Sequence, residues 1–134
     1  MATILAHLKV KPGSEAQFEA IARELYRNTH ALEADVLRYE YWRGAEPGTY
    51  YTLLSFRDFP GFIVHQTSDH HETASPQLGQ VLAGIRLEWL DPVPEASPLP
   101  PTRAGGVPAD ADELSRTYAE RYAAQIASWW GGVG

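Results

Sequence analysis

The sequence predicts an α+β fold, in which a four-stranded antiparallel sheet carries its helices on one face and an extra helix is appended at the C-terminus. Three observations lead to this prediction. Strand-like and helix-like segments follow one another in the order β-α-β-β-α-β, and right-handed crossovers place the helices of such an order on one face. The length of 134 residues suits one core. A proline-rich stretch at residues 92–108 separates this core from a last helical segment.

The first two elements are a strand and a long amphipathic helix. Residues 2–10 are rich in β-compatible apolar side chains and stop at the Lys-Pro-Gly turn signal of residues 11–13. Apolar residues then recur at three- and four-residue steps through residues 14–32, which predicts a helix with one apolar face. Ser14 and Gln17 have the spacing of a capping box, so we expect the helix to begin there.

A hairpin and a first short helix come next. Residues 36–43 and 49–57 are strand-like and rich in aromatic side chains, and the glycines and proline of residues 44–48 between them predict the turn of a hairpin. Asp58 is a candidate N-cap for a short helix. We expect this helix to break at residues 68–71.

The last elements of the core are a second helical piece and a strand. Ser75-Pro76 predicts that the helix restarts there and runs through Leu82, because proline suits the first turn of a helix. Residues 85–90 predict the final strand, which Asp91-Pro92 stops.

The chain therefore divides into three parts. Residues 1–91 form the folded domain, and residues 92–108 form an extended linker with few bulky apolar side chains. Residues 109–134 hold an amphipathic helix, expected over 109–130, and its tail. The apolar residues of this helix step by four and predict docking on a protein surface: Leu114, Tyr118, Tyr122, Ile126 and Trp130.

Both faces of the predicted sheet carry apolar residues. In the first strand Ala6 and Leu8 alternate with Leu5, and the adjacent Leu53 and Leu54 repeat the pattern in the third strand. Such alternation predicts that both faces are buried. An identical subunit packed sheet to sheet through a two-fold axis is the simplest cover for the open face, so we expect a homodimer.

Composition excludes several classes of function. Seventeen acidic residues against eleven basic ones give a formal charge of −6, which disfavours a nucleic-acid partner. Because there is no cysteine, thiolate metal ligands and a cysteine nucleophile are excluded. The N-terminus resembles no signal peptide and no apolar stretch is long enough to span a membrane, so a cytoplasmic location without a membrane partner is the expectation.

Four ordered segments resemble the antibiotic-biosynthesis monooxygenase family. They are Val-Lys-Pro-Gly at residues 10–13, Glu33 with Val-Leu-Arg-Tyr-Glu at 36–40, Phe-Arg-Asp at 56–58 and His-Gln-Thr-Ser-Asp-His at 65–70. The resemblance covers about the first two thirds of the chain. Two positions depart from the pattern, since Ser55 stands where the family often has Glu, and Asp35 where it often has Gly.

The resemblance implies a ferredoxin-like domain that pairs into a dimeric α/β barrel. Characterised enzymes of the family include oxygenases that act on quinols and polycyclic phenols without metal, flavin or nicotinamide. Other relatives in the superfamily bind and degrade heme, and many members have no known activity. A fold of this kind does not by itself determine the activity.

His65 is the candidate catalytic base. Cofactor-free oxygenation needs a base that converts a phenol into an electron-rich anion, and histidine is the natural base near neutral pH. His65 occupies the position of a histidine in the family pattern. The alternative is a structural imidazole that bonds the turn at residues 68–70. A metal cluster with Asp69, His70 and His71 is not expected, because helical metal pairs usually lie four residues apart.

The remaining candidates are contacts to a small aromatic substrate. Aromatic rings on strands suit a planar ligand. The residues chosen are Phe56 and Trp89 as lining rings, Tyr51 and Ser55 as polar contacts from the other strand parity, His7 at the cavity or the subunit interface, and His70 in the turn.

The function expected on these grounds is cofactor-independent monooxygenation of a small aromatic or quinol-like compound. Phosphate-binding loops, dinucleotide fingerprints and serine-nucleophile motifs do not occur, so kinases, dehydrogenases and hydrolases lack support. Two alternatives stay open. One is a non-catalytic small-molecule-binding or sensing dimer, and the other is a heme-binding relative, for which the sequence suggests no axial ligand.

Overall fold

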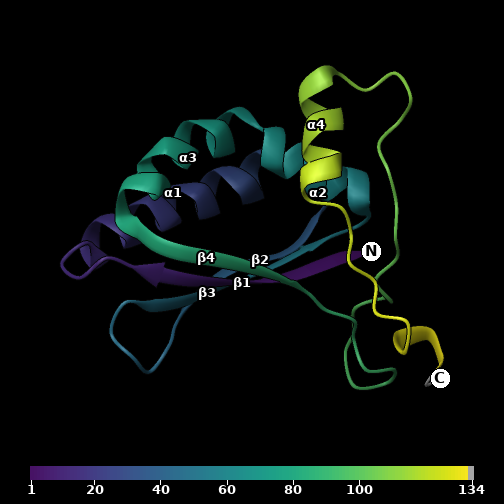
Figure 1. The fold of residues 1–134 in the computed structure, drawn as a ribbon, viewed down its shortest axis with the longest axis horizontal. Coiled ribbons are helices and arrows are strands. Elements are labelled where there is room, and N and C mark those ends of the chain that lie inside the picture. Colours follow the sequence, from purple (N-terminus) through teal and green to yellow (C-terminus); the bar gives the residue numbers. More distant parts are fainter. Residues whose placement is uncertain (133–134) are drawn as a thin grey trace.

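The computed structural model describes residues 1–132, in which a four-stranded antiparallel sheet of order β2-β3-β1-β4 carries its helices on one face (Figure 1). This confirms the predicted α+β, ferredoxin-like architecture. The elements are β1 (Ala2–Val10), α1 (Glu15–Leu32), β2 (Val36–Arg43), β3 (Thr49–Phe56), α2 (Phe59–Thr67), α3 (Asp69–Val81), β4 (Leu82–Trp89), α4 (Glu113–Arg121) and the 3₁₀ turn η1 (Trp130–Gly132).

The central strand β1 sets the register of the sheet. It pairs with β3 from Ala2 opposite Phe56 to Lys9 opposite Thr49, and with β4 on its other side. Because side chains alternate along a strand, one parity class of β1 faces the helices and is buried in the core, from Ala2 to Val10. The core therefore lies between the sheet and helices α1, α2 and α3.

Helix α1 buries the face that its sequence predicts. Its buried residues are Phe18, Ile21, Ala22, Leu25 and Thr29. The predicted capping box is wrong, because Ser14 makes no side-chain capping bond. The turn before the helix depends instead on Gly13, whose φ of +87° is a conformation that only glycine adopts without strain.

The two short helices meet at Ser68. Asp58 caps α2 as predicted, since its Oδ1 accepts from the Gly61 N–H at 2.9 Å. Helix α3 begins at Asp69, so the predicted restart at Ser75-Pro76 is wrong and Pro76 lies inside the helix. Ser68 caps α3 by accepting from the His71 N–H at 3.3 Å. That cap allows the helix to start early, although Pro76 cannot donate the bond to the carbonyl four residues before it.

Strand β4 follows α3 without a loop. It begins at Leu82, which was expected to be helical, and not at residue 85. The backbone N–H of Lys11 donates to the Val81 carbonyl at 2.8 Å, so the chain is already bonded to the end of β1 where the helix ends. Pairing with β1 thus moves the element boundary by three residues, a shift that local propensity does not reveal.

The linker is tied to the end of the sheet. The Thr102 hydroxyl donates to the Leu90 carbonyl at 2.6 Å, and the Thr102 N–H donates to Asp91 Oδ1 at 2.9 Å. At the other chain end, the Met1 ammonium donates to the Pro101 carbonyl at 3.2 Å. These bonds fix the middle of the linker, even though it contains no helix or strand.

The C-terminal helix is shorter than predicted. It spans Glu113–Arg121 and not residues 109–130, because Asp112 caps it and the chain leaves the helix at Tyr122. Tyr118, Tyr122 and Trp130 pack against the core, as expected, whereas Ile126 is 40% exposed. After the helix ends, the chain returns Trp130 to a partly buried position against the core.

The open face of the sheet is only partly apolar. Leu5 and Leu53 are cross-strand neighbours at its centre, but His7 pairs with Glu88 at 2.9 Å beside them. Linker residues also reach this side, where a hollow of about 230 Å³ lies between them and the sheet. The expectation of an apolar open face is therefore too simple, because charged residues surround the leucine pair. No helix within residues 1–132 is long and apolar enough to cross a membrane.

Candidate functional site

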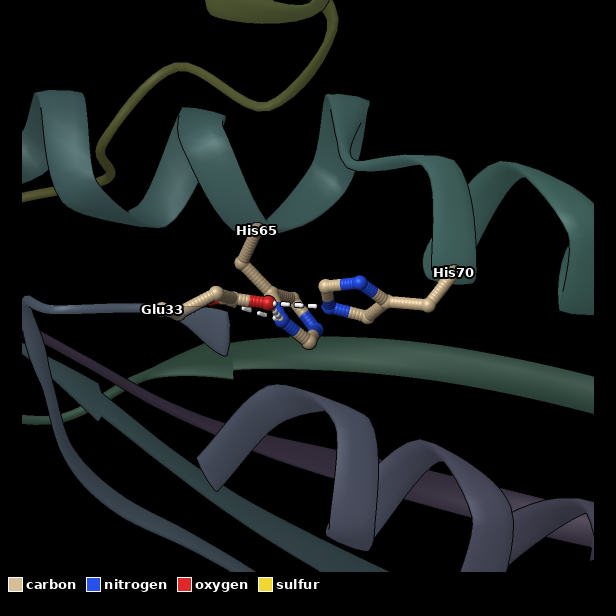
Figure 2. A group of neighbouring side chains, drawn as sticks. All are labelled: Glu33, His65 and His70. Atoms are coloured by element: carbon tan, nitrogen blue, oxygen red, sulfur yellow. Dashed lines mark hydrogen bonds and ion pairs between the residues drawn. The ribbon is translucent and has the colours of Figure 1, made fainter. Parts of the chain in front are cut away.

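Three segments that are distant in sequence meet beside the sheet. Glu33 follows the last residue of α1, His65 lies in the last turn of α2, and His70 lies in the first turn of α3 (Figure 2). The change of direction at Ser68 places the two histidines on either side of the carboxylate. The fold, and not sequence proximity, forms this group.

Glu33 holds both histidines by hydrogen bonds. His65 Nδ1 lies 2.9 Å and 3.2 Å from the two Glu33 oxygens, and His70 Nε2 lies 2.5 Å from Oε2 (Figure 2). The side chains of Glu33 and His65 are 4% and 1% exposed. Because an ionised carboxylate only accepts hydrogen bonds, each imidazole donates one N–H to it. A neutral His65 therefore carries its proton on Nδ1 and an open lone pair on Nε2.

Glu33 remains ionised despite its burial. Burial raises the pKa of Glu33, but the hydrogen bonds and positive potential of His65, followed by those of His70, more than offset this effect, and the net pKa is below 4.5. The group thus places a negative charge next to both imidazoles.

A cavity of about 460 Å³ lies between the helices and the sheet, and His65 is part of its wall. Its surface is mostly apolar, with aliphatic residues from β1, β3 and β4. Among residues 1–132, His65 Nε2 and His71 Nδ1 are buried nitrogens without a hydrogen-bond partner. Since an unpaired buried polar atom is costly, these nitrogens are positioned for a ligand or a water molecule.

Within the described residues, the cavity lining contains no Asp, Glu, Lys or Arg side chain. Burial, followed by the electrostatic effect of the nearby His65 ring, lowers the pKa of His71 to about 3. The hydroxyls of Tyr39 and Tyr41 lie 2.7 Å apart. Burial raises the pKa of Tyr41 to about 12 and that of Tyr39 well above 10. Both phenols therefore remain protonated near neutral pH and can donate hydrogen bonds.

Only some of the residues chosen from the sequence meet at this cavity. His65 lines it. Phe56 lies behind the His65 ring, with centroids 5.2 Å apart, and is fully buried. Trp89 packs with Phe59 and Phe62 at the end of the sheet. His70 bonds Glu33 and borders a different hollow, next to α1.

The three residues of the other strand parity lie on the opposite face of the sheet. His7 contacts the Tyr51 ring edge to face at 5.5 Å, and Ser55 bonds the Thr3 hydroxyl at 2.9 Å. None of the three lines the cavity within the described part of the chain. The sheet separates them from His65, because alternate side chains of a strand point to opposite faces.

The sequence-based choice of site residues omitted five that matter here. Tyr39, Tyr41 and Thr52 line the cavity because β2 and β3 pair in the observed register, which places Tyr41 opposite Thr52. His71 was considered only as a metal ligand. Glu33 was part of the family resemblance, so a signal for it existed. The spacing of the histidines did not reveal the role of Glu33, because this carboxylate comes from a distant segment, directly after α1.

The same three residues could bind a metal ion. The ligand atoms of Glu33, His65 and His70 all lie within 4.8 Å of one another, and two imidazoles with one carboxylate suit several divalent transition metals. An ion would have to replace the hydrogen bonds to Glu33. It would use Nδ1 of His65 and leave the unpaired Nε2 unexplained, so the geometry favours the hydrogen-bonded group.

A ferredoxin-like domain with a buried histidine-lined cavity defines the class of this protein. The chain belongs to the antibiotic biosynthesis monooxygenase family, whose sequence model matches residues 1–77. No curated protein matches the chain.

Solved structures agree with this assignment. A Caulobacter crescentus CB15 protein named for the same family is 30% identical, with a TM-score of 0.65 over 69% of this chain and 89% of its own. Rv0793 from Mycobacterium tuberculosis is 21% identical, with a TM-score of 0.65 over 72% and 98%. PA3566 from Pseudomonas aeruginosa is 22% identical, with a TM-score of 0.64 over 69% and 93%. The last two similarities concern the fold alone.

Proposed function

We propose that the protein is a cofactor-independent monooxygenase of a small aromatic or quinol-like compound, with His65 as the catalytic base. One observation carries the proposal: His65 lines the cavity, its Nε2 is buried without a hydrogen-bond partner, and Glu33 holds Nδ1 at 2.9 Å. Family membership supports the same type of reaction.

The reaction begins with proton transfer. His65 Nε2 takes the proton of a substrate hydroxyl, and the resulting anion gives one electron to O₂ more readily than the neutral phenol does. The substrate radical and superoxide then join in a carbon–oxygen bond. The proton held on His65 passes to the peroxide, which loses water. A quinol and one O₂ thus yield one hydroxyquinone and one water, and all electrons come from the substrate.

Glu33 acts as a positioning residue for His65. Its hydrogen bond fixes the orientation of the ring and leaves Nε2 as the basic nitrogen, and its charge stabilises the imidazolium formed in the first step. His70 donates a second bond to the same carboxylate. This second bond keeps the carboxylate in place while His65 changes its charge.

The walls of the cavity fit the rest of the reaction. Apolar side chains make up most of the cavity wall and disfavour water, which would otherwise quench radical intermediates. The neutral hydroxyl of Tyr41 and the hydroxyl of Thr52 lie in the same cavity and can hydrogen-bond a substrate or peroxide oxygen. A volume of about 460 Å³ is in the range of small-molecule sites.

Oxygen uptake tests the proposal. The assay uses a panel of quinols and polycyclic phenols with a chelator and without added flavin, and compares the wild type with His65→Ala. Val64→Ala is the matched control, because Val64 is next to His65 on α2 and is 56% exposed. We expect uptake in stoichiometric proportion to the substrate, lost in His65→Ala and retained in Val64→Ala.

The same cavity also supports a non-catalytic binding function. In that case the protein consumes no oxygen with any compound of the panel, and a bound small molecule is detected by mass spectrometry. His65 Nε2 is also the nitrogen that an iron porphyrin would use as its axial ligand. A Soret band that appears with added hemin in the wild type and is absent in His65→Ala would favour this third function.

The proposed enzyme is a homodimer. Leu5 and Leu53 form an apolar centre on the open face of the sheet, and the ion pairs around them resemble the polar rim of an interface. A sheet-to-sheet contact would bury this face.

A further inference from the structure

The chain after β4 contributes to the wall of the cavity. Tyr122, the residue that ends α4, lines the cavity together with His65 and His71. Its ring meets the Phe62 ring edge to face, with centroids 6.1 Å apart. Helix α4 stands beside α2, the helix that carries His65 (Figure 1). An element outside the core of the fold thus reaches the site.

Tyr122 packs against Tyr118, and two further contacts hold Tyr118 in place. The Tyr118 hydroxyl donates to Glu72 Oε1 on α3 at 2.7 Å. The rings of Tyr118 and Tyr122 pack edge to face at 5.6 Å, and the Arg121 guanidinium lies 4.9 Å from the Tyr118 ring centre. Farther back, the bonds of Thr102 tie the linker to the sheet. Tyr122 is therefore a fixed part of the wall.

This wall is not part of the shared fold. The family match ends at residue 77. The structural matches cover 87–100% of the neighbours but only 65–72% of this chain. The segment after β4 accounts for about the share that is left. The core residues of the cavity thus belong to the common domain, whereas Tyr122 comes from an addition.

We propose that Tyr122 contacts the ligand and limits the size of the ring system that the cavity admits. An aromatic ring in the wall offers a flat ligand an edge or a face to pack on. Removal of the Tyr122 ring would enlarge the cavity on the side where α4 packs. The ligand class, a quinone or quinol, rests on the proposed function. The role of Tyr122 as a wall rests on the contacts alone.

Binding of two quinones tests the proposal. The probes are duroquinone, which has one ring, and 2-methyl-1,4-naphthoquinone, which has two, and binding is followed by quenching of protein fluorescence. The absence of cysteine rules out thiol addition to either quinone. The variants are Tyr122→Ala and Tyr122→Trp. Ile126→Ala is the matched control, because Ile126 lies in the same segment and is 40% exposed.

Opposite changes in size preference are expected. Tyr122→Ala weakens duroquinone binding by about tenfold, because the ring loses a wall, and weakens naphthoquinone binding less. Tyr122→Trp weakens naphthoquinone binding more than duroquinone binding. Ile126→Ala leaves both affinities unchanged. If Tyr122 only stabilised the fold, both affinities would fall together with the melting temperature, and their ratio would stay constant. An unchanged ratio in both variants overturns the proposal.

A measurement without ligand separates this proposal from the proposed function. If the wild type binds neither quinone, the quinol assignment fails, and the wall is judged by NMR titration of the His71 ring. Opening the wall in Tyr122→Ala admits water, so the pKa of His71 rises from about 3 toward its ordinary 6.5. In that case, a His71 titration that is the same in Tyr122→Ala and in the wild type would show that Tyr122 does not close the cavity.

Discussion

His65 donates its Nδ1 proton to Glu33 across 2.9 Å, a contact that joins the end of α2 to the residue after α1. Both side chains are almost fully buried. This contact fixes the imidazole in one tautomer and leaves Nε2 without a hydrogen-bond partner.

Replacement of His65 by Ala should reduce turnover by about a hundredfold or more, the range expected for loss of a general base. Oxygen uptake per folded molecule is the measurement, with circular dichroism and sedimentation as checks of fold and assembly. A purely structural histidine would behave differently. Its loss would lower the melting temperature, while the activity would stay proportional to the amount of folded protein.

Glu33→Gln should lower turnover by at least about tenfold, because the amide is neutral and does not stabilise the imidazolium. Its effect on stability should depend on pH. The lowered pKa of Glu33 stabilises the folded state fully above pH 4.5, and this contribution is lost as the pH falls through the lower folded value. The gap in unfolding free energy between wild type and variant should therefore narrow in acid. Glu24→Gln, on the exposed side of α1, is the control, and an equal gap for both variants would contradict this assignment.

His71→Phe should make the protein less sensitive to acid. The pKa of His71 is about 3 in the folded state and 6.5 ordinarily, so between these values the unfolded chain binds a proton that the folded one does not. The neutral His71 therefore costs the folded state nothing above pH 6.5. Below that pH the free energy of unfolding falls as the pH decreases, by at most about 1.4 kcal/mol per pH unit. Denaturant unfolding of both proteins from pH 7 to pH 4 measures the difference. Parallel curves would mean that His71 titrates normally.

Leu5→Lys should convert the proposed homodimer into monomers, because a long charged side chain would replace an apolar one at the centre of the sheet-to-sheet interface, beside Glu88, which His7 already engages. Sedimentation equilibrium at micromolar concentration measures the assembly. The control is Val64→Lys, which introduces the same charge at an exposed position of α2. A wild type that is monomeric at this concentration would refute the homodimer.

Deletion of the chain after Pro92 should lower the melting temperature by at least about 5 °C. The segment covers Phe59 and Phe62, which are 3% and 1% exposed in the intact protein, and exposure of such rings costs about 1.5–3 kcal/mol each. Differential scanning calorimetry and binding of an apolar dye measure the change. Unchanged unfolding would show that the segment is free of the core.

Much of the fold could be predicted from local signals. The three- and four-residue apolar steps of α1 match its buried face, and Asp58 caps α2. These features depend on neighbours within one or two helical turns. Ser75-Pro76 misled the prediction, because proline at a first turn and proline inside a helix look alike in sequence. The cap at Ser68 decided between them.

The sequence by itself determined the order of the elements and the family, and it indicated His65 as a candidate, because these depend on periodicity and on short ordered motifs. Only the tertiary structure showed that His65 lies on the same side of the sheet as Tyr41 and on the opposite side from Tyr51, because this placement depends on strand register. It also decided that Glu33 joins His65 and His70, and that Tyr122 lines the cavity. These contacts connect residues from separate elements, and their positions depend on how the whole core packs.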